Sequence, residues 1–294
     1  MPSGILLLDK PRGLSSNAAL QRVRALFARE KAGHVGTLDP LGTGMLPLCL
    51  GEATKIAGDL LAGRKCYRFS IGLGSATTTG DSEGEVTERA PVPPLAAALV
   101  ESVLARFRGP QRQLPPMYSA IKQEGQPLYR LARRGVSVPR AERAIEIFEL
   151  VLRDWESGAL ELETLCSKGT YVRVLAADIA AALGTCGHVT ALRRLYVEPF
   201  ASQPMHTFES LVAARPAEEW PQLLPIDWPL QHLPMLRLQP GEAERFAHGQ
   251  QIASDGLLST PRARVYDASG RFLGIGATDA AGWLQPRRLI RPAP

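Results

Sequence analysis

The stretch Gly33-His34-Val35-Gly36-Thr37-Leu38-Asp39-Pro40-Leu41-Gly42-Thr43-Gly44 places a single carboxylate on a glycine-rich turn, with a histidine just upstream. Glycines adopt backbone conformations that other residues avoid and let the chain approach a ligand closely, and Pro40 biases Asp39 towards extended geometry. The pattern predicts an active-site loop that presents Asp39 to a substrate. A plain structural turn is the alternative, because Asp-Pro and Gly-rich dipeptides are common turn formers and a lone histidine usually has no catalytic task.

The glycines of this loop do not match the patterns that bind nucleotide cofactors. A Walker loop needs a lysine after its second glycine, and the other Gly-x-Gly stretches, at Gly72 and Gly274, lack the third glycine of a dinucleotide fingerprint. The four cysteines lack the paired spacing of metal ligands, and a chain of this size does not need disulfides. They are Cys49, Cys66, Cys166 and Cys186. We therefore expect no nucleotide cofactor, no structural zinc and a reducing, cytoplasmic environment.

Length and charge limit the class of protein. The 294 residues, of which 45% are hydrophobic, can bury a sizeable core and suffice for one large domain and a small one. Lysine and arginine number 34 against 29 acidic residues, and the net charge of +5 favours a polyanionic partner without requiring one. Residues 1–8 lack the features of a secretory signal and no apolar run is long enough to span a membrane, so we expect no membrane association.

Two elements precede the Asp39 loop. Residues 5–8 are apolar and favour a short buried strand, which Lys10-Pro11-Arg12-Gly13 ends. Ser15 or Ser16 can cap the helix that follows, whose apolar residues share one face. This amphipathic helix would deliver the chain to the loop.

The segment after the loop begins with a strand. Residues 66–73 alternate between apolar and small or polar side chains, which predicts one buried face with Tyr67 near its start. The next stretch, residues 74–84, is rich in glycine and threonine and carries Asp81 and Glu83, which we interpret as ordinary turn residues. Residues 95–107 then predict a helix.

Residues 114–143 combine prolines and glycines with many basic side chains. The basic residues include Lys122 and Arg130, and Tyr118 and Tyr129 are interleaved with them. Basic side chains bind phosphates and exposed tyrosines stack on bases, so the composition is typical of a nucleic-acid-binding excursion. A solvated loop with two core tyrosines fits the composition equally well.

The residue pattern also predicts a pairing between distant side chains. Residues 172–183 carry the apolar stripe of a helix, and Arg173 falls in its first turn. A positive charge there does not complement the helix dipole. This misfit is a small clue that Arg173 pairs with another group, such as a carboxylate, for which Asp39 is the natural candidate. A surface arginine is the default alternative.

The remaining segments suggest a hairpin and a second domain. Residues 145–155 and 159–166 predict two strands joined by a turn around Glu156-Ser157-Gly158. Between residues 199 and 234 the composition shifts towards proline and tryptophan, which is typical of packing segments and a linker. Short strand-like pieces after Leu233 favour a small β-barrel.

Several separate motifs resemble, in their order along the chain, those of the bacterial TruB family of tRNA pseudouridine synthases. They are Leu8-Asp9-Lys10-Pro11-Arg12-Gly13 with Ser15-Ser16-Asn17, Gly33 to Gly44, Tyr67, Pro116-Met117-Tyr118-Ser119-Ala120-Ile121-Lys122, Lys168-Gly169-Thr170-Tyr171-Val172-Arg173, and Leu192-Arg193-Arg194-Leu195. The resemblance implies an α+β pseudouridine synthase fold with a largely antiparallel central sheet over residues 1–232. Residues 114–143 would be an RNA-binding insertion, and residues 233–294 a small β-barrel, PUA-like RNA-binding domain.

The resemblance also implies a reaction. The enzyme would isomerise uridine to pseudouridine at position 55 in the T-loop of tRNA, without a cofactor or a metal. The C–N glycosidic bond breaks, the uracil turns, and its C5 joins the ribose. The partner would be the T-arm of tRNA, and we expect a monomer that needs no obligate protein partner.

By the same resemblance, Asp39 matches the essential catalytic carboxylate and Arg173 the arginine that pairs with it. Tyr67 matches a tyrosine that stacks against the target base and assists proton transfer from C5. His34 matches a histidine that contacts nucleotides displaced when the uridine is flipped out. The remaining RNA-binding residues would be Lys10, which would also support the loop, and Tyr118, Lys122, Arg130, Leu192 and Arg193.

Two other functions stay open from the sequence. A tRNA-folding chaperone would open the loop of the RNA without needing the catalytic set. A synthase acting on ribosomal RNA or guided by a small nucleolar RNA is the other, although the long basic insertion and short C-terminal part look more like the stand-alone bacterial type. The chain departs from the family at Val35, where a threonine is common, and at Thr78, where many relatives carry an aspartate.

Overall fold

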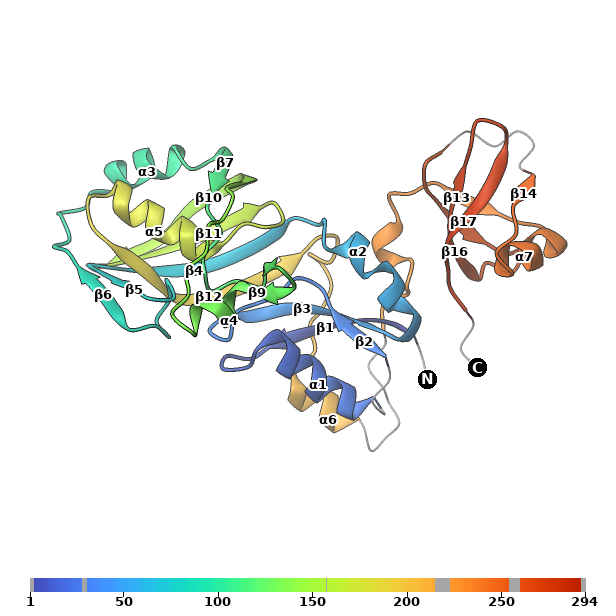
Figure 1. Ribbon diagram of the computed structural model, residues 1–294, viewed down its shortest axis with the longest axis horizontal. Helices are drawn as coiled ribbons and strands as arrows, with labels where there is room; N and C mark the ends of the chain where they lie inside the picture. The colour runs from blue at the N-terminus through green and yellow to red at the C-terminus, as the bar shows by residue number, and fades with distance from the viewer. Residues whose placement is uncertain (1–2, 28–30, 157, 215–222, 254–259, 292–294) are drawn as a thin grey trace.

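The computed structural model describes residues 3–27, 31–156, 158–214, 223–253 and 260–291. In this part of the chain, one large and one small sheet form two bodies, the smaller built from the C-terminal residues (Figure 1). Ser157 of the predicted hairpin turn lies outside the described residues. None of the helices in these ranges is both long enough and apolar enough to cross a membrane.

The large sheet has eight strands. Its main path runs β1-β3-β12-β4-β11-β10-β7, and β2 pairs with β3. The strands are β1 (Gly4–Lys10), β2 (Ala32–His34), β3 (Thr43–Leu50), β4 (Lys65–Leu73), β7 (Gly109–Gln113), β10 (Arg143–Glu156), β11 (Ala159–Cys166) and β12 (Gly187–Val197). All neighbours are antiparallel except β3 and β12, which run parallel. The predicted, largely antiparallel central sheet is thus confirmed.

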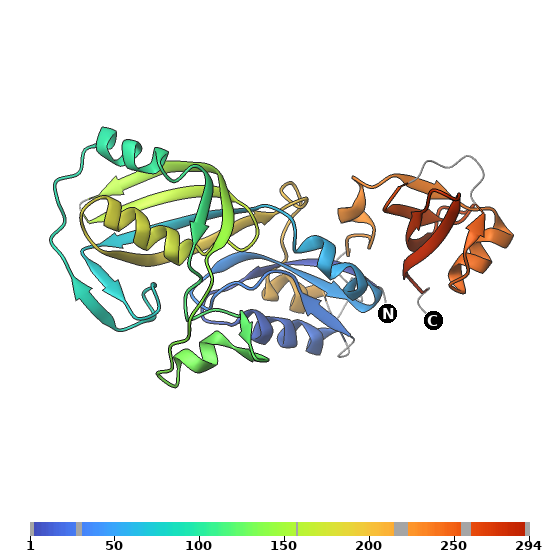
Figure 2. The ribbon, with the colours of Figure 1, turned by 45° about the horizontal axis from the view of Figure 1, so that its top comes forward.

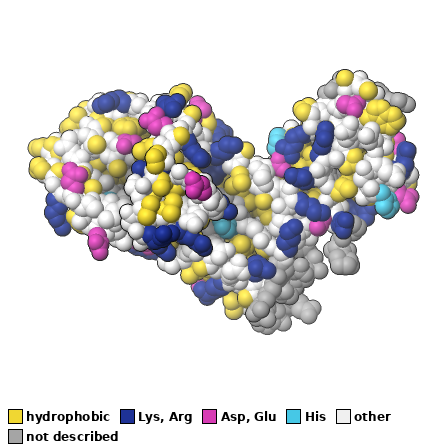
Figure 3. Space-filling view, viewed as in Figure 1, with side chains coloured by type: hydrophobic (Ala, Val, Ile, Leu, Met, Phe, Trp, Pro, Cys, Tyr) yellow, Lys and Arg dark blue, Asp and Glu magenta, His cyan; other side chains and the backbone are white. Residues whose placement is uncertain are grey.

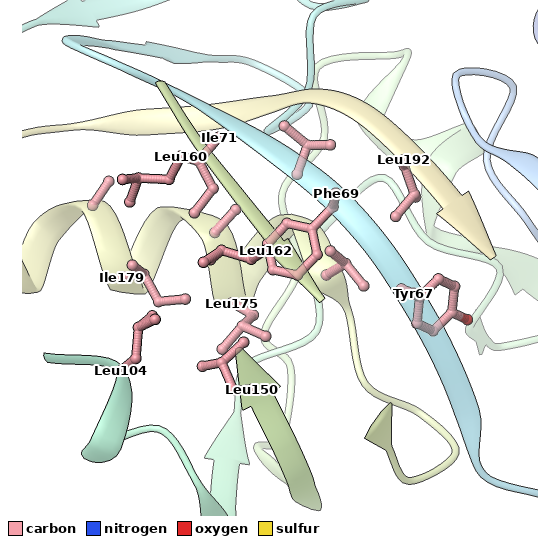
Figure 4. Close-up of a cluster of buried hydrophobic side chains, with 14 of the residues drawn as sticks. Tyr67, Phe69, Ile71, Leu104, Leu150, Leu160, Leu162, Leu175, Ile179 and Leu192 are labelled. Atoms are coloured by element: carbon pink, nitrogen blue, oxygen red, sulfur yellow. The ribbon is translucent and has the colours of Figure 1, made fainter. Parts of the chain in front are cut away.

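One face of this sheet is covered by α3 (Ala97–Ala105) and α5 (Val172–Ala182), which lie over β10, β11 and β4 (Figure 2). Strand β4 supplies Tyr67, Phe69 and Ile71 from alternate positions, because successive strand residues point to opposite faces (Figure 4). The buried face that the sequence predicts for this strand therefore packs against α5.

The β1–β3 end of the sheet carries α1 (Ser16–Leu26) and α6 (Phe208–Ala214). The Ser15 hydroxyl caps α1 by accepting a hydrogen bond from the Ala18 N–H at 3.1 Å. Leu20 and Val23 of α1 are buried in the cluster beneath. Since α1 leads directly to β2 and the Asp39 loop, this packing fixes where the loop begins.

The opposite side of β1 and β3 packs on three short helices. They are η1 (Gly51–Ile56), α2 (Ala57–Leu60) and η2 (Trp228–Leu230), and they share one hydrophobic cluster with the strands.

Two small hairpins project from the large sheet towards the site. The first pairs β5 (Ser75–Thr77) with β6 (Val86–Arg89). The second lies in residues 114–143 and consists of β8 (Lys122–Gln123), β9 (Gln126–Pro127) and α4 (Leu128–Ala132). Figures 1 and 2 place α4 near the start of α1, on the side of the sheet that carries the Asp39 loop.

The C-terminal body is a five-stranded sheet in the order β13-β15-β16-β17-β14, which curls into a half-barrel around α7 (Pro240–Ala247). Its strands are β13 (Met235–Arg237), β14 (Ile252–Ala253), β15 (Ala263–Tyr266), β16 (Phe272–Thr278) and β17 (Trp283–Leu289). The two ends of the sheet do not pair with each other among the described residues. The curled half-barrel confirms the predicted β-rich, PUA-like architecture.

Several contacts fix the two bodies to each other. Ile275 of β16 is fully buried in the same cluster as Leu230. The Tyr266 hydroxyl donates to the Asp227 carboxylate at 2.6 Å, and Lys55 Nζ donates to the Leu289 carbonyl at 2.7 Å.

Candidate active site

The loop that carries Asp39 is held in place by hydrogen bonds to its backbone from a serine side chain and from other backbone groups. Ser16 Oγ donates to the Leu38 carbonyl at 2.9 Å and accepts from the Leu38 N–H at 2.8 Å. The Asp39 carbonyl accepts from Gly42 N–H at 2.9 Å, and the Pro40 carbonyl accepts from Gly13 N–H at 2.8 Å. These bonds leave the Asp39 side chain about one-third exposed, at 33%, on an otherwise rigid turn.

Gly44 shows why this loop needs a glycine at its end. Its φ is +95°, and a Cβ atom there would lie 2.2 Å from the Arg194 carbonyl oxygen on β12. A larger residue would therefore separate β3 from β12 or strain the turn.

Lys10 occupies the interior beneath the loop. Its side chain is fully buried, and Nζ donates to the carbonyls of Leu14 at 2.7 Å and Pro11 at 2.9 Å. Burial lowers the pKa of Lys10 to about 8, against the nearby carboxylates of Asp39 and Glu83, which raise it. The RNA-binding role predicted for Lys10 needs correction, because the side chain has no surface to offer and supports the loop instead.

Arg173 and Asp39 lie together. Arg173 Nε donates to Asp39 Oδ2 at 2.9 Å and Nη2 donates to Oδ1 at 3.2 Å, so the guanidinium grips both oxygens. Its side chain is only 6% exposed. Such bidentate pairs fix orientation as well as charge.

The same guanidinium joins two further segments to the loop. Nη1 donates to the Thr79 carbonyl at 2.7 Å, and Nη2 donates to the Tyr118 carbonyl at 2.8 Å. Arg173 therefore connects the Asp39 loop, the turn after β5 and the insertion.

Asp81 is a site residue that sequence reasoning took for an ordinary turn residue. It is buried, its Oδ2 lies 3.8 Å from Arg173 Nε, and its Oδ1 accepts from Thr79 Oγ1 and the Glu83 N–H. A second carboxylate thus stands behind the guanidinium. No local pattern marks it, because only the tertiary fold brings residues 81 and 173 together.

A cavity of about 750 Å³ opens beside Asp39. Tyr67 and Leu192, from the neighbouring strands β4 and β12, form part of its wall, and each is 7% exposed. Figure 4 shows the Tyr67 ring beside Leu192, with its hydroxyl pointing away from the aliphatic cluster. Burial raises the pKa of the Tyr67 hydroxyl, and Arg194 lowers it by a smaller amount.

Basic side chains surround this cavity. Lys65, Arg143 and Lys168 line it together with Arg173 and Arg194, whereas Asp39 is its one lining carboxylate in the part of the chain that the structure describes. Burial also lowers the pKa of Lys65 to about 8. This charge balance suits an anionic ligand.

A second cavity, of about 470 Å³, opens on the other side of Asp39. It is lined by His34, Tyr118 and Tyr129 among others, and by Asp81. Burial, followed by the charge of Arg194, lowers the pKa of His34, so its ring is neutral near pH 7. Its Nδ1 is buried and has no hydrogen-bond partner in the described structure.

The insertion residues are placed unequally. Lys122 and Arg130 are exposed on the insertion and line neither cavity. Tyr118 is half-buried, and its backbone carbonyl is the acceptor for Arg173. Arg133 lies over the Tyr129 ring, with its Cζ atom 5.7 Å from the ring centroid.

Of the two neighbouring arginines on β12, the structure places Arg194 at the cavity and not Arg193, the one predicted to bind RNA. Arg193 points to the opposite face of the sheet from Leu192 and forms a two-bond pair with Asp9, at 3.0 and 2.8 Å. Arg194 shares the face of Leu192 and lines the cavity. Arg193, predicted to contact RNA, therefore does not line the cavity, and strand alternation counted from Leu192 selects Arg194 instead.

Among the described residues, no group of three or more His, Cys, Asp or Glu side chains is placed to hold a metal ion. The arrangement brings one carboxylate, its guanidinium partner and a buried phenol to a basic cavity. It can therefore act on a substrate by nucleophilic or acid–base chemistry from the protein's own side chains.

Known proteins match this chain along nearly its whole length. The family described as TruB family pseudouridylate synthase, N-terminal domain, matches residues 24–172. A tRNA pseudouridylate synthase B C-terminal domain matches residues 173–231, and a pseudouridine synthase II TruB C-terminal domain matches residues 234–290.

Curated relatives include the tRNA pseudouridine synthase B of Chromohalobacter salexigens, 48% identical over 99% of this chain and 95% of the relative. That of Dechloromonas aromatica is 48% identical over 99% of this chain and 96% of its own. Among solved structures, a chain of a Cbf5-Nop10-Gar1 complex superposes with a TM-score of 0.73 at 21% identity, covering 98% of this chain and 85% of that one. This last likeness concerns the fold alone.

The family match and the curated relatives define a pseudouridine synthase, an enzyme that isomerises uridine to pseudouridine. Within that class, the chain belongs to the TruB family.

Proposed function

We propose that this enzyme converts the uridine at position 55 in the T-loop of tRNA to pseudouridine, with Asp39 as the essential catalytic residue. The proposal rests on one observation. The buried Arg173 holds the carboxylate of Asp39 with two hydrogen bonds beside a basic cavity that Tyr67 helps to line. The curated relatives, named for tRNA pseudouridine synthesis, support the choice of RNA.

Asp39 acts on the target nucleotide as a nucleophile or a base, and Arg173 holds both its oxygens towards the cavity. The N1–C1′ bond breaks, the uracil turns within the cavity, and a C5–C1′ bond forms. The proton on C5 then leaves, and N1 takes one from solvent, so product and substrate have the same atoms. Tyr67, on the wall of the cavity, is the group we assign to the C5 proton.

The target base must leave its stack to reach Asp39, and this unstacking costs about a few kcal/mol. His34 lines the second cavity beside Asp39, where it can hold the nucleotides that lose their neighbour. Because burial keeps its ring neutral near pH 7, a packing and hydrogen-bonding role suits it better than a charge contact with phosphate.

The enzyme would bind the T-arm of its tRNA through the insertion of residues 114–143 and the C-terminal body. Lys122 and Arg130 are exposed on the insertion, and Figure 3 shows further basic side chains on both sides of the notch between the two bodies. We propose a division into a catalytic domain of residues 1–232 and an RNA-binding domain of residues 233–294. We further propose a cytoplasmic monomer without an obligate protein partner, as the resemblance to the stand-alone bacterial family implies.

Folding assistance alone would not require this site. A protein that only opens tRNA has no use for a buried guanidinium aligned on a carboxylate, so catalysis is the function that the geometry favours. Any help to tRNA folding would accompany the reaction.

The test is tritium release from unmodified tRNA labelled at uridine C5. Wild-type protein should release the label of one uridine per transcript, and a transcript with cytidine at position 55 should lose none. Asp39→Asn, which keeps the size of the side chain, should bind the tRNA and release no label. Release by Asp39→Asn at the wild-type rate would refute the role of Asp39, and release from the cytidine transcript would refute position 55.

A further inference from the structure

Arg194 is the largest fully buried side chain of the described structure and lies between the Asp39 loop and Tyr67. It stands directly opposite Tyr67 in the register of β12 and β4, so both side chains point to the cavity face. Directly paired residues on neighbouring strands are close enough for their side chains to touch. The site therefore has a buried cation next to its phenol.

Two nitrogens of this guanidinium are held by backbone. Nε donates to the Met45 carbonyl at 2.6 Å, and Nη2 donates to the Gly36 carbonyl at 2.9 Å. Both carbonyls belong to the segment that carries Asp39. The head group is thus fixed in position by the same loop that presents the catalytic carboxylate.

The third nitrogen, Nη1, is buried and has no partner that meets the full geometric criteria for a hydrogen bond among the described residues, although the Arg194 side chain lies within hydrogen-bonding reach of the Tyr67 hydroxyl. A buried guanidinium with a missing partner is costly. Hydrogen bonds to the Met45 and Gly36 carbonyls do not by themselves explain a permanently charged side chain at this position, because a neutral donor could form the same bonds.

Tyr67 is the neighbour on which the charge acts. Its other cross-strand partner, Thr164, already donates its hydroxyl to the Glu149 carbonyl at 2.8 Å. Burial raises the pKa of the Tyr67 hydroxyl, and the Arg194 guanidinium opposes that rise, whereas Cys166 and Asp39 add to it. Arg194 is the one influence from a neighbouring side chain that favours the phenolate.

We propose that Arg194 is a positioning residue for pseudouridine formation, which holds the Tyr67 oxygen and stabilises its anionic form while that oxygen takes the C5 proton. The Tyr67 hydroxyl first gives its own proton to solvent; the proton on C5 then passes to the phenolate oxygen, and the electron pair of the C–H bond returns to the ring of the uracil. The phenol later gives the proton to solvent. The inference rests on the proposed role of Tyr67.

A double-mutant cycle tests the proposal. Single-turnover rates of pseudouridine formation are measured for wild type, Arg194→Lys, Tyr67→Phe and the double variant, with enzyme in excess over tRNA. Arg194→Lys should slow the wild-type enzyme by about 100-fold, the scale of a misplaced catalytic group. In the Tyr67→Phe background the same substitution should change the rate by about 3-fold or less, because the hydroxyl on which Arg194 acts is gone. Equal losses in both backgrounds would mean that Arg194 only supports the loop, and would overturn the proposal.

The adjacent arginine is the matched control. Arg193→Lys alters a partly exposed residue on the other face of the sheet and should leave the rate within about 2-fold of wild type, as is usual for a surface change. A loss in Arg193→Lys as large as that in Arg194→Lys would also count against the proposal.

A second readout does not depend on turnover and decides the matter if Tyr67→Phe is too slow to measure. With tyrosine labelled at Cζ, the resonance of Tyr67 is assigned by its absence in Tyr67→Phe. It should shift on Arg194→Lys and stay in place on Arg193→Lys, whereas an unmoved resonance in both would overturn the proposal. If the wild-type enzyme forms no pseudouridine, the proposed function is wrong. If Tyr67→Phe is as fast as the wild type, the role assigned to Tyr67 is wrong. An additive cycle defeats only the inference on Arg194.

Discussion

Arg173 reaches across 134 positions of sequence to hold both carboxylate oxygens of Asp39, at 2.9 and 3.2 Å. Its remaining donors bind the carbonyls of Thr79 and Tyr118, so four segments meet at one planar group. A guanidinium suits this junction because its donors have a fixed fork geometry, whereas an ammonium is a point charge on a flexible stem. The Asp39 carboxylate is thus oriented by the same residue whose donors bind the insertion at Tyr118.

This relationship predicts that Arg173→Lys is not a conservative change. The lysine keeps the charge but loses the two-bond grip on Asp39 and at least one of the two carbonyl contacts. We expect the single-turnover rate to fall by about 100-fold or more, with tRNA affinity changed far less. Quench-flow rates at saturating enzyme, alongside filter binding, separate the two quantities. A near-normal rate in Arg173→Lys or Arg173→Ala would remove the pairing role.

Tyr67 is predicted to contribute its ring and its hydroxyl separately. Tyr67→Phe keeps the aromatic wall beside Leu192 and loses only the hydroxyl, whereas Tyr67→Leu loses both. If the hydroxyl moves the C5 proton, tritium release by Tyr67→Phe should fall by about 100-fold or more, the usual scale of acid–base catalysis. Should Tyr67→Phe match wild type while Tyr67→Leu fails, the residue serves stacking and packing alone.

Sequence periodicity anticipated those parts of the molecule that depend on local pattern. The strand at Tyr67 and the helix at Arg173 begin and face as predicted, because alternation and the 3.6-residue stripe are properties of each segment by itself. The charge misfit of Arg173 even pointed to its partner. Resemblance to a family supplied the reaction, which no periodicity contains.

The parts that the sequence did not reveal depend on contacts between distant segments. Asp81 looked like a turn residue because its partner, Arg173, is far along the chain. The resemblance implied both an RNA contact and loop support for Lys10, and its burial beneath the loop, where carbonyls of Pro11 and Leu14 satisfy its ammonium, could not be read from the sequence. Arg193 and Arg194 could be separated only once the strand β12 was seen, since only Arg194 shares the strand face of Leu192.

His34 is predicted to affect RNA engagement rather than chemistry. It lines the second cavity, and burial, followed by the charge of Arg194, lowers its pKa, so the ring stays neutral at pH values below those at which an exposed histidine takes up its proton. His34→Ala should weaken productive tRNA binding by about 10-fold, which corresponds to the loss of roughly one base contact. Titration of binding at fixed salt, with the rate measured at saturating enzyme, provides the comparison. Unchanged binding with a slow chemical step would contradict the assignment.

The insertion is predicted to bind phosphate. Lys122→Ala and Arg130→Ala each remove an exposed cation, so each should lower the slope of log affinity against log salt by about 1 if its side chain contacts a phosphate. The double variant should lower it by about 2, because the two contacts are separate. Affinities between low and physiological salt give the slope directly. Weaker binding with an unchanged slope would mean that these residues act by shape and not by charge.

Lys10 gives a prediction for the dependence of stability on pH. Burial lowers its pKa in the folded protein to about 8, below the ordinary value of 10.5 that it regains on unfolding. Between these two pH values the unfolded chain binds more protons than the folded one, so this group makes the free energy of unfolding rise with pH. Below pH 8 the lysine is charged in both states, and the cost of burying that charge is present in full. Over the whole window the gain is on the order of 3 kcal/mol.

Lys10→Met, which keeps the length of the side chain without its charge, removes this dependence. The difference in free energy of unfolding between wild type and Lys10→Met should therefore grow in favour of wild type from about pH 8 to about pH 10.5. Taking the difference cancels other groups that titrate there, such as Lys65 and the buried Cys49 and Cys166. Urea unfolding at a series of pH values measures it, and Lys122→Met, at an exposed site, is the control that should show no trend. A flat difference for Lys10→Met would mean that its ammonium keeps its proton in the folded interior, held by the carbonyls of Leu14 and Pro11 more strongly than burial weakens it.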